Sequence, residues 1–247
     1  MDWQERTRLL IGQTGLDKLS RSRVAVFGLG GVGSFAAEAL ARSGVGRLLL
    51  IDYDHVAPSN INRQIHALSN TVGRLKIDLM AERISLINPG ALLDLRAEKY
   101  TTGSGPAFLE PAPDFVLDAI DDVKAKVDLL AFCVVRGIPV VSAMGAGKKL
   151  NPAGFRVADI SATSVCPLAR VVRRLLRQKG ITSGIPVVFS TEQPIGAASC
   201  PGGCGPVAED AECPAKPLPG SISFVPPVAG LIMAGFAVNR LLEVTND

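Results

Sequence analysis

Three glycines with the spacing G-x-G-x-x-G, Gly28, Gly30 and Gly33, follow an apolar run and open a stretch rich in small residues. This spacing lets a chain turn tightly between a strand and a helix, and lets a nucleotide pyrophosphate approach the amino end of that helix. Asp52 lies roughly 20 positions further on, where such folds place the acidic residue that binds the ribose. The residues predict a nucleotide site without choosing between NAD and ATP. The competing interpretation is that the glycines only permit close helix–strand packing.

A group of polar residues follows the second apolar run and distinguishes between the two nucleotides. Asn60, Arg63 and Gln64 come directly after it, and Lys76 stands in the first turn of the next predicted helix. Hydride transfer needs no second cation, whereas displacement of pyrophosphate builds negative charge on phosphate oxygens that two cations stabilise. Arg63 and Lys76 therefore favour ATP. An isolated Arg and Lys would more often form a solvated surface pair, but both lie beside strand ends.

Strand and helix patterns alternate through the first 150 residues. Strand patterns cover 23–28, 47–52, 92–97, 115–121 and 138–143, and helix patterns cover 31–44, 73–88 and 122–137. This alternation predicts an α/β fold of the Rossmann type, a doubly wound, mainly parallel sheet with helices on both faces. Ligands of such sheets bind beyond the carboxyl ends of the strands, where Gly28 and Asp52 fall. Asp121 and Asp122 fall there too, and either could hold a magnesium ion that shields ATP.

The regular alternation of strand and helix patterns ends after residue 150. Strands are predicted at 154–160 and 186–190, a basic helix at 167–180 and an apolar helix at 227–243. Residues 191–220 hold six of the seventeen prolines, and we expect a mobile loop there. Because no repeat or linker interrupts the chain, we predict a single domain over 1–247, with a nucleotide-binding core at 1–150 and a substrate-side extension at 151–247.

Composition narrows the setting in which the protein works. Apolar residues make up 47% of the chain and charged residues 20%, which suits a well-buried core, and the net charge of +3 permits an anionic partner. The chain starts without a secretory signal pattern, and its five cysteines, an odd number, indicate reduced thiols. The apolar run at 224–238 is shorter than the roughly 20 residues of a membrane span. We therefore expect a cytoplasmic protein without membrane insertion.

The blocks GLGGVGS, DYDHVAPSNINRQ, Lys76 and DAIDD, in this spacing, resemble the adenylating superfamily related to ubiquitin-activating enzymes. That superfamily includes the activators of the molybdopterin and thiamine sulfur carriers. Within it the chain is most similar to the branch that dehydrates threonylcarbamoyladenosine in tRNA. The likeness covers nearly the whole chain, and its markers are RTRLLIG, NRQIHAL, AERISLINP, TSVCPLARVVRR and GSISFVPPVAGLIMA.

The resemblance implies that a substrate carboxylate attacks the α-phosphate of ATP, that pyrophosphate leaves, and that the resulting acyl-adenylate closes into a ring and releases AMP. It also implies a homodimer, because Arg6 resembles the arginine that reaches the ATP site of the other subunit; alternatively, Arg6 is a mobile terminal charge. The implied catalytic residues are Arg63, Lys76 and Asp121, with Asp121 binding Mg²⁺. The implied nucleotide-binding residues are Gly28, Gly30, Gly31, Gly33, Asp52, Asp54, Asn60, Arg63, Gln64, Lys76 and Asp121.

A basic stripe on the helix at 167–180 indicates the nucleic-acid partner. It consists of Arg170, Arg173, Arg174, Arg177 and Lys179, with Lys148 and Lys149 as a possible extension. Such a stripe could contact tRNA phosphates, although basic helices also occur as merely solvated faces.

Two other activities remain open, besides a non-catalytic scaffold whose cellular role Lys76→Ala would leave intact. One is adenylation of the terminal glycine of a ubiquitin-like sulfur carrier, against which the basic helix and an incomplete zinc pattern speak. The other is an NAD-dependent dehydrogenase, which Arg63, Lys76 and Asp121 oppose.

The cysteines and histidines add no firm site. Carrier activators bind zinc through two C-x-x-C pairs, whereas this chain has Cys200, Cys204 and a single further Cys213. An inert mobile lid is preferred over zinc binding or a thioester or persulfide role in sulfur transfer. Cys133 is expected in the core. His66 could lie near the site, but two histidines so far apart indicate no catalytic dyad.

Overall fold

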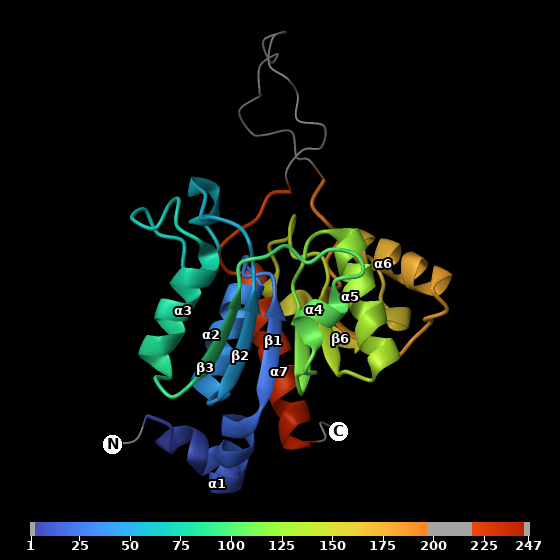
Figure 1. Ribbon diagram of the computed structural model, residues 1–247. Helices are drawn as coiled ribbons and strands as arrows, with labels where there is room; N and C mark the ends of the chain where they lie inside the picture. Colours follow the sequence, from blue (N-terminus) through green and yellow to red (C-terminus); the bar gives the residue numbers. More distant parts are fainter. Residues whose placement is uncertain (1–2, 197–218, 245–247) are drawn as a thin grey trace.

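The computed structural model describes residues 3–196 and 219–244. A sheet with the strand order β3-β2-β1-β4-β5-β7-β6 forms its centre (Figure 1). Every neighbouring pair is parallel except β6 with β7. The strands are β1 (Arg23–Phe27), β2 (Arg47–Ile51), β3 (Leu92–Arg96), β4 (Phe115–Asp118), β5 (Val140–Ala143), β6 (Phe155–Asp159) and β7 (Pro186–Ser190). The strand order reverses between β1 and β4, which opens a crevice at their carboxyl ends.

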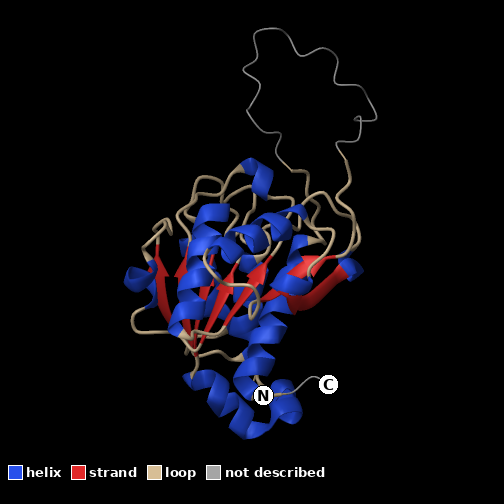
Figure 2. Ribbon diagram, turned by 90° about the vertical axis from the view of Figure 1, so that its right-hand side faces the viewer, coloured by secondary structure: helices blue, strands red, loops and turns tan. Residues whose placement is uncertain are grey.

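Helices cover both faces of this sheet, as Figures 1 and 2 show. They are α1 (Glu5–Arg21), α2 (Gly33–Ser43), α3 (Lys76–Ile87), α4 (Gly105–Leu109), α5 (Val123–Arg136), α6 (Pro167–Gln178) and α7 (Pro226–Leu242). Strand β1 shows why two layers are needed, because its residues alternate between faces. Val24 and Val26 pack into the core under α2, α3 and α7, whereas Ala25 and Phe27 pack into the core under α4, α5 and α6.

The predicted α/β architecture is confirmed, including the apolar C-terminal helix. Helix α7 packs on α2 and β5, and β7 with β6 extends the same sheet, so the second half of the chain is integrated with the first. No helix within the described residues is long and apolar enough to cross a membrane. Some boundaries differ from the sequence patterns. The strand expected at 115–121 ends at Asp118, and the helix expected at 73–88 begins at Lys76.

The sequence patterns missed two helices, α1 and α4. Helix α1 is interrupted at Gly12, where φ is +71°, and its Leu9 and Leu10 side chains are both 85% exposed. These two apolar residues of α1 are exposed, and the kink divides the helix in two. Its sequence therefore shows no clear helical period. Helix α4 is too short to show one.

Close packing between α2 and α7 depends on Gly230. A methyl group at Gly230 would overlap the carbonyl oxygen of Val32, whereas one at Gly235 on the same helix would meet nothing within 4 Å. We predict that Gly230→Ala lowers the free energy of unfolding by about 1–3 kcal/mol through overpacking. The matched variant Gly235→Ala should raise it by about 0.5–1 kcal/mol, because alanine is the better helix former. Urea denaturation measures both, and equal effects of the two substitutions would contradict the packing argument.

Candidate nucleotide site

A cavity of about 530 Å³ opens at the carboxyl ends of the central strands. Its wall is formed by the loop after β1, the ends of β2, β4 and β5, and the segment before α7. The polar and charged residues in this wall are Asp52, Tyr53, Asp54, Asn60, Arg63, Gln64, Lys76, Glu98, Lys99, Tyr100, Asp121, Asp122 and Ser221. The sequence-predicted nucleotide residues therefore meet at one place, apart from Gly33 and Arg6.

The glycines of the loop after β1 have separate roles. Gly28 has φ +83°, and a Cβ there would lie 2.8 Å from the carbonyl oxygen of Ala119. A Cβ at Gly33 would overlap the carbonyl oxygen of Gly28. A Cβ at Gly30 would meet only Gln64 Nε2, at 3.9 Å, so Gly30 faces the open cavity. Gly28 and Gly33 thus serve the turn and the packing, and Gly30 leaves space for a phosphate near the amino end of α2.

Asp52 joins the glycine loop to the end of β2. Its Oδ2 accepts a hydrogen bond from the Leu29 amide at 2.5 Å, and its Oδ1 accepts one from the Asp54 amide at 2.8 Å. Burial raises the pKa of Asp52, and the Lys76 charge acts against this rise. Each carboxylate oxygen keeps a further lone pair, so Asp52 can accept a ribose hydroxyl as the sequence predicts.

Lys76 is a buried cation at the cavity wall, with 5% of the residue exposed. Its Nζ lies 2.8 Å from Asp54 Oδ2, and its backbone amide donates to the Asp54 carbonyl at 3.0 Å. Asp54 is half-exposed, so the pair has one buried and one solvated partner. In this structure Asp54 holds the lysine in place at the edge of the cavity.

Arg63 lies beside Gly31 of the glycine loop and lines the cavity. A Cβ on Gly31 would lie 3.1 Å from Arg63 Cγ, so the arginine side chain passes close to the loop. Arg63 Nη1 donates to the Ser59 carbonyl at 2.9 Å and to Asn62 Oδ1 at 2.8 Å. The arginine is thus held over the loop.

The two amide residues near Arg63 differ in their bonding. Asn60 Oδ1 accepts from the Ala57 amide at 3.1 Å, which closes the short helix Pro58–Asn60. Gln64 is buried in the cavity wall, and within the described ranges its Oε1 has no hydrogen-bond partner. An unpaired buried amide oxygen is costly, which is typical of an atom that bonds to a ligand.

The structure separates the roles of Asp121 and Asp122. Asp122 Oδ1 accepts from the Ala125 amide at 2.9 Å and caps α5. Asp121 is exposed to the cavity, and no hydrogen bond or ion pair connects it to another described residue. The described residues contain no cluster of three or more His, Cys, Asp or Glu suited to a metal. A single carboxylate fits Mg²⁺ in particular, because this ion usually binds through one or two carboxylates plus phosphate oxygens and water.

The sequence allowed His66 to lie near the site. The structure instead places it outside the cavity wall. Its ring is buried, and neither ring nitrogen has a partner among the described residues. Burial lowers the pKa of His66 to about 4, with the Lys76 and Arg83 charges acting in the same direction. The imidazole is therefore neutral at physiological pH. Cys133 is fully buried in the core, as expected.

Helix α6 starts at the cavity and is strongly amphipathic. Leu168 in its first turn lines the cavity, while Ala169, Val172 and Leu176 are buried in the core that α6 shares with α5. Arg170, Arg174 and Arg177 are exposed, together with Lys179 just after the helix.

Two predicted cations of this surface are used within the fold. Arg173 is half-buried, and its Nη1 donates to the Thr163 carbonyl at 2.9 Å. Lys149 is 3% exposed, and its Nζ donates to the Glu192 carbonyl. The extension of the basic stripe through Lys149 is therefore wrong, and Arg173 fastens α6 to the preceding turn. Lys148 stays partly exposed, with its backbone at φ +59°.

Arg6 does not line the nucleotide cavity of its own chain. It is exposed on α1, below the amino ends of the strands in Figure 1, and it lines a second, mainly apolar cavity formed by α1, α2 and α7. Cys200, Cys204, Cys213 and most of the loop expected at 191–220 lie outside the described residues.

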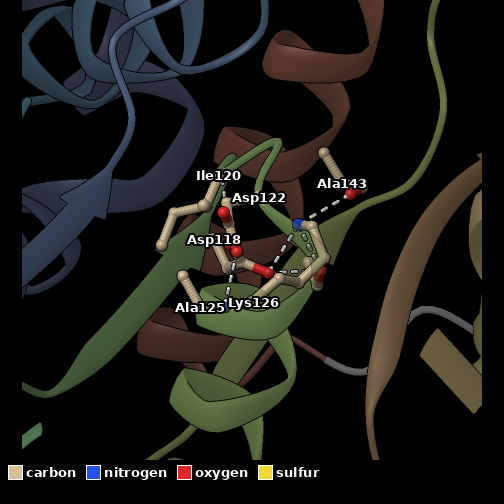
Figure 3. Close-up of polar contacts among 7 residues, drawn as sticks. Asp118, Ile120, Asp122, Ala125, Lys126 and Ala143 are labelled. Atoms are coloured by element: carbon tan, nitrogen blue, oxygen red, sulfur yellow. Dashed lines mark hydrogen bonds and ion pairs between the residues drawn. The ribbon is translucent and has the colours of Figure 1, made fainter. Parts of the chain in front are cut away.

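Sequence reasoning missed a buried polar group beneath the cavity, which consists of Asp118, Lys126 and Ser142 (Figure 3 shows its contacts). A signal existed in the sequence. Lys126 stands at helical spacing from the apolar residues Leu129, Leu130 and Cys133, and Asp118 opens the DAIDD block.

Comparison with known proteins places these residues in a family. The model of the ThiF family matches residues 4–247. A tRNA threonylcarbamoyladenosine dehydratase of Bacillus subtilis is 48% identical over 248 residues, covering 96% of this chain and 94% of the relative. The molybdopterin-synthase adenylyltransferase of Escherichia coli is 37% identical over 135 residues, about half of each protein.

A solved structure matches the fold over nearly the full length. The tRNA N6-threonylcarbamoyladenosine dehydratase of E. coli in complex with ATP has a TM-score of 0.84 and 34% identity, covering 98% of this chain and 95% of that one. The family model, the close sequence relative and this structure agree, and the chain belongs to the ThiF family.

Proposed function

We propose that this chain adenylates the threonylcarbamoyl carboxylate of a modified adenosine beside the tRNA anticodon and then cyclises it, releasing AMP and pyrophosphate. One observation carries the proposal. Lys76, Arg63 and the unpaired Asp121 line the same cavity, and Gly30 leaves open space in its wall. Relatives that cover nearly the whole chain are dehydratases acting on this nucleoside, whereas the carrier-activating relative matches about half.

The residues divide the work of the first step. Gly30 and the amino end of α2 hold the phosphates, and Asp52 accepts from the ribose. As the substrate carboxylate attacks the α-phosphate, negative charge builds on the leaving pyrophosphate, and Lys76 and Arg63 stabilise it. Gln64 Nε2, which lies beside Gly30, would donate to a phosphate oxygen, and the unpaired Gln64 Oε1 would accept from a donor on the ligand. Mg²⁺, when bound by Asp121, would neutralise phosphate oxygens.

The second step needs less from the protein. The activated carbonyl is attacked from within the same threonylcarbamoyl group, the ring closes, and AMP takes the carboxyl oxygen with it. The net change on tRNA is the loss of one water. Intramolecular attack is favoured by proximity, so the cavity must mainly hold the adenylate and exclude water.

The tRNA lies along α6 in this proposal. Arg170, Arg174 and Arg177 are exposed on a helix whose first turn lines the cavity, so a backbone bound to them leads toward the reacting nucleoside. Lys148 adds a charge near the cavity. A tRNA substrate agrees with the cytoplasmic location expected from the sequence.

We further propose a homodimer that forms through the face of α1, α2 and α7. This face contains the second cavity, of about 640 Å³, and the exposed Leu10 and Leu231. A large apolar surface on a folded protein usually marks an interface. Arg6 would then act in the nucleotide site of the partner. Sedimentation as a monomer at micromolar concentration would contradict this arrangement.

The glycine loop gives a direct test of nucleotide binding. We predict that Gly30→Ala folds normally but binds ATP about tenfold more weakly, a loss of about 1.4 kcal/mol, because its methyl group occupies the phosphate space. Gly33→Ala should instead lower the melting temperature, because its methyl group overlaps the Gly28 carbonyl. Titration with ATP and thermal unfolding separate the two effects, and unchanged ATP affinity in Gly30→Ala would refute the placement.

The central prediction concerns Lys76. Lys76→Met should lower kcat of tRNA dehydration by about 10²–10³-fold, the usual cost of losing a group that stabilises developing charge, and should change KM for ATP much less. The fold should persist because the abandoned Asp54 is half-exposed. Lys18, paired with Glu243 on the far side of the sheet, provides the control Lys18→Met.

Mass spectrometry of tRNA nucleosides after incubation with ATP measures this reaction as the loss of one water from the threonylcarbamoyl nucleoside. Pyrophosphate exchange that responds to a sulfur-carrier protein and not to modified tRNA would favour the rival activator. Tight nicotinamide binding without ATP binding would favour a dehydrogenase.

The α6 surface predicts a salt effect. Replacing Arg170, Arg174 and Arg177 together by Gln should weaken tRNA binding and reduce the salt dependence of the affinity by about one unit of slope per phosphate contact. ATP affinity should not change. Arg47, exposed at the amino end of β2, provides the control Arg47→Gln. An unchanged slope in the triple variant would show that α6 is only a solvated face.

A further inference from the structure

A buried ion pair, which the proposed chemistry does not use, lies beneath the residues that line the nucleotide cavity. Asp118 at the end of β4 and Lys126 in the first turn of α5 have fully buried side chains, with Nζ 2.7 Å from Asp118 Oδ2. Ser142, near the end of β5, is equally buried. Figure 3 shows Asp118 and Lys126 pointing toward one another, with the Lys126 amine also directed at the Ala143 carbonyl.

Every polar atom of this group is satisfied. Lys126 Nζ has three N–H donors and three acceptors, namely Asp118 Oδ2, Ser142 Oγ at 3.2 Å and the Ala143 carbonyl at 3.1 Å. Ser142 Oγ donates to Asp118 Oδ2 at 2.6 Å, and Asp118 Oδ1 accepts from the Ile120 amide at 3.1 Å. The lysine therefore connects the end of β4, the end of β5 and the start of α5 through directional bonds.

These contacts reach two parts of the cavity wall. Asp118 holds the turn that contains Ala119, Ile120 and Asp121, all of which line the cavity. Ala119 also supports the glycine loop, because its amide donates to the Phe27 carbonyl at 2.8 Å and its own carbonyl fills the space beside Gly28. On the other side, the bond to Ala143 fixes the start of the wall segment that runs to Gly147.

Stability alone is a poor explanation for this arrangement. A positive charge in the first turn of a helix opposes the helix dipole. Removing two charges from water costs about as much as their attraction returns, and apolar residues of similar volume often serve equally well. What an ion pair supplies and apolar packing does not is a fixed direction for each bonded group.

We propose that Asp118, Lys126 and Ser142 form a positioning clamp, which sets the Asp121 carboxylate and the glycine loop at the spacing required for attack on the α-phosphate. The three residues act through Asp121 and Ala119 and touch no reactant. The inference rests on the proposed adenylation function. Its alternative is a group that serves the fold only.

The test replaces the charges without leaving one buried alone. In the double variant Asp118→Leu/Lys126→Met both charges are removed and the volume is nearly kept, so the chain should still unfold cooperatively. The control is Ile84→Ala, which creates a cavity in the core under α3, remote from these residues. Ser142→Ala removes a single member and serves if the double variant fails to fold.

Three readouts distinguish a clamp from a stability element. Hydrogen exchange at the Ile120 amide should become at least about tenfold faster in the clamp variants and not in Ile84→Ala, because exchange reports local opening. kcat of pyrophosphate exchange with modified tRNA should fall about 100-fold, the cost of a misplacement near 1 Å. The Mg²⁺ concentration that gives half-maximal tightening of ATP binding should rise, since Asp121 is no longer held.

The outcomes are separable. Clamp variants with kcat within twofold of wild type, or losses equal to those of Ile84→Ala at the same melting temperature, would overturn the proposal. Unchanged exchange at Ile120 would do the same. If wild-type protein binds no ATP, the proposed function fails, and the Ile120 exchange still decides whether the group rigidifies the turn.

Discussion

The site depends on one steric constraint, the close approach of the loop after β1 to the turn after β4. The Ala119 carbonyl occupies the space where a side chain on Gly28 would begin, and the Gly28 carbonyl occupies that space at Gly33. These contacts bring α2 and the β4–α5 turn to the same edge of the sheet, at the point where the strand order reverses. A phosphate-binding helix end and a carboxylate can face one cavity only because neither glycine has a Cβ. A larger residue at either position would move a whole wall of the cavity, not a single contact.

The charges around the cavity are balanced without a ligand, and this has consequences for the cycle. Lys76 is buried, and a buried cation without a partner is expensive. Asp54 meets this need at 2.8 Å while remaining half-exposed. When a triphosphate approaches, Lys76 can turn to it and leave Asp54 to water, so neither state contains an isolated buried charge. Asp52 is placed differently, with both oxygens already bonded to backbone amides. Asp52 is therefore held in place independently of Lys76, as the ribose-binding role proposed for it requires.

The sheet and the grouping of the site residues could be predicted from the sequence, because they depend on hydrophobic periodicity and on the glycines and prolines that end the elements. Glycine spacing, apolar runs and the residues just beyond them gave the parallel sheet, and parallel strands bring their carboxyl ends to one edge, so Asp52, Lys76 and Asp121 could be grouped without coordinates. Spacing does not reveal the partner of a side chain. Whether Arg173 faces solvent or Thr163 depends on the path of a turn ten residues away, and Lys149 is buried by a contact with Glu192. Asp118 and Lys126 pair across a strand end and a helix start, and although the sequence shows each as a polar residue at an apolar position, it does not show that the two are partners.

The nucleotide cavity and helix α1 lie at opposite ends of the sheet, and this restricts how two copies of the chain could share a site. The carboxyl ends hold the cavity and the first turn of α6, whereas α1 lies at the amino ends and contacts α7, with Lys18 bonded to Glu243 at 2.9 Å. Helix α1 lies at the opposite end of the sheet from the nucleotide cavity (Figure 1), and Arg6 on this helix lines the second cavity and not the nucleotide cavity. An arginine that assists ATP from this position must therefore belong to a partner whose α1 end meets the cavity end of this chain. In a two-fold dimer the same must hold in the other direction, so the two molecules would lie antiparallel, each with its α1 beside the other's cavity.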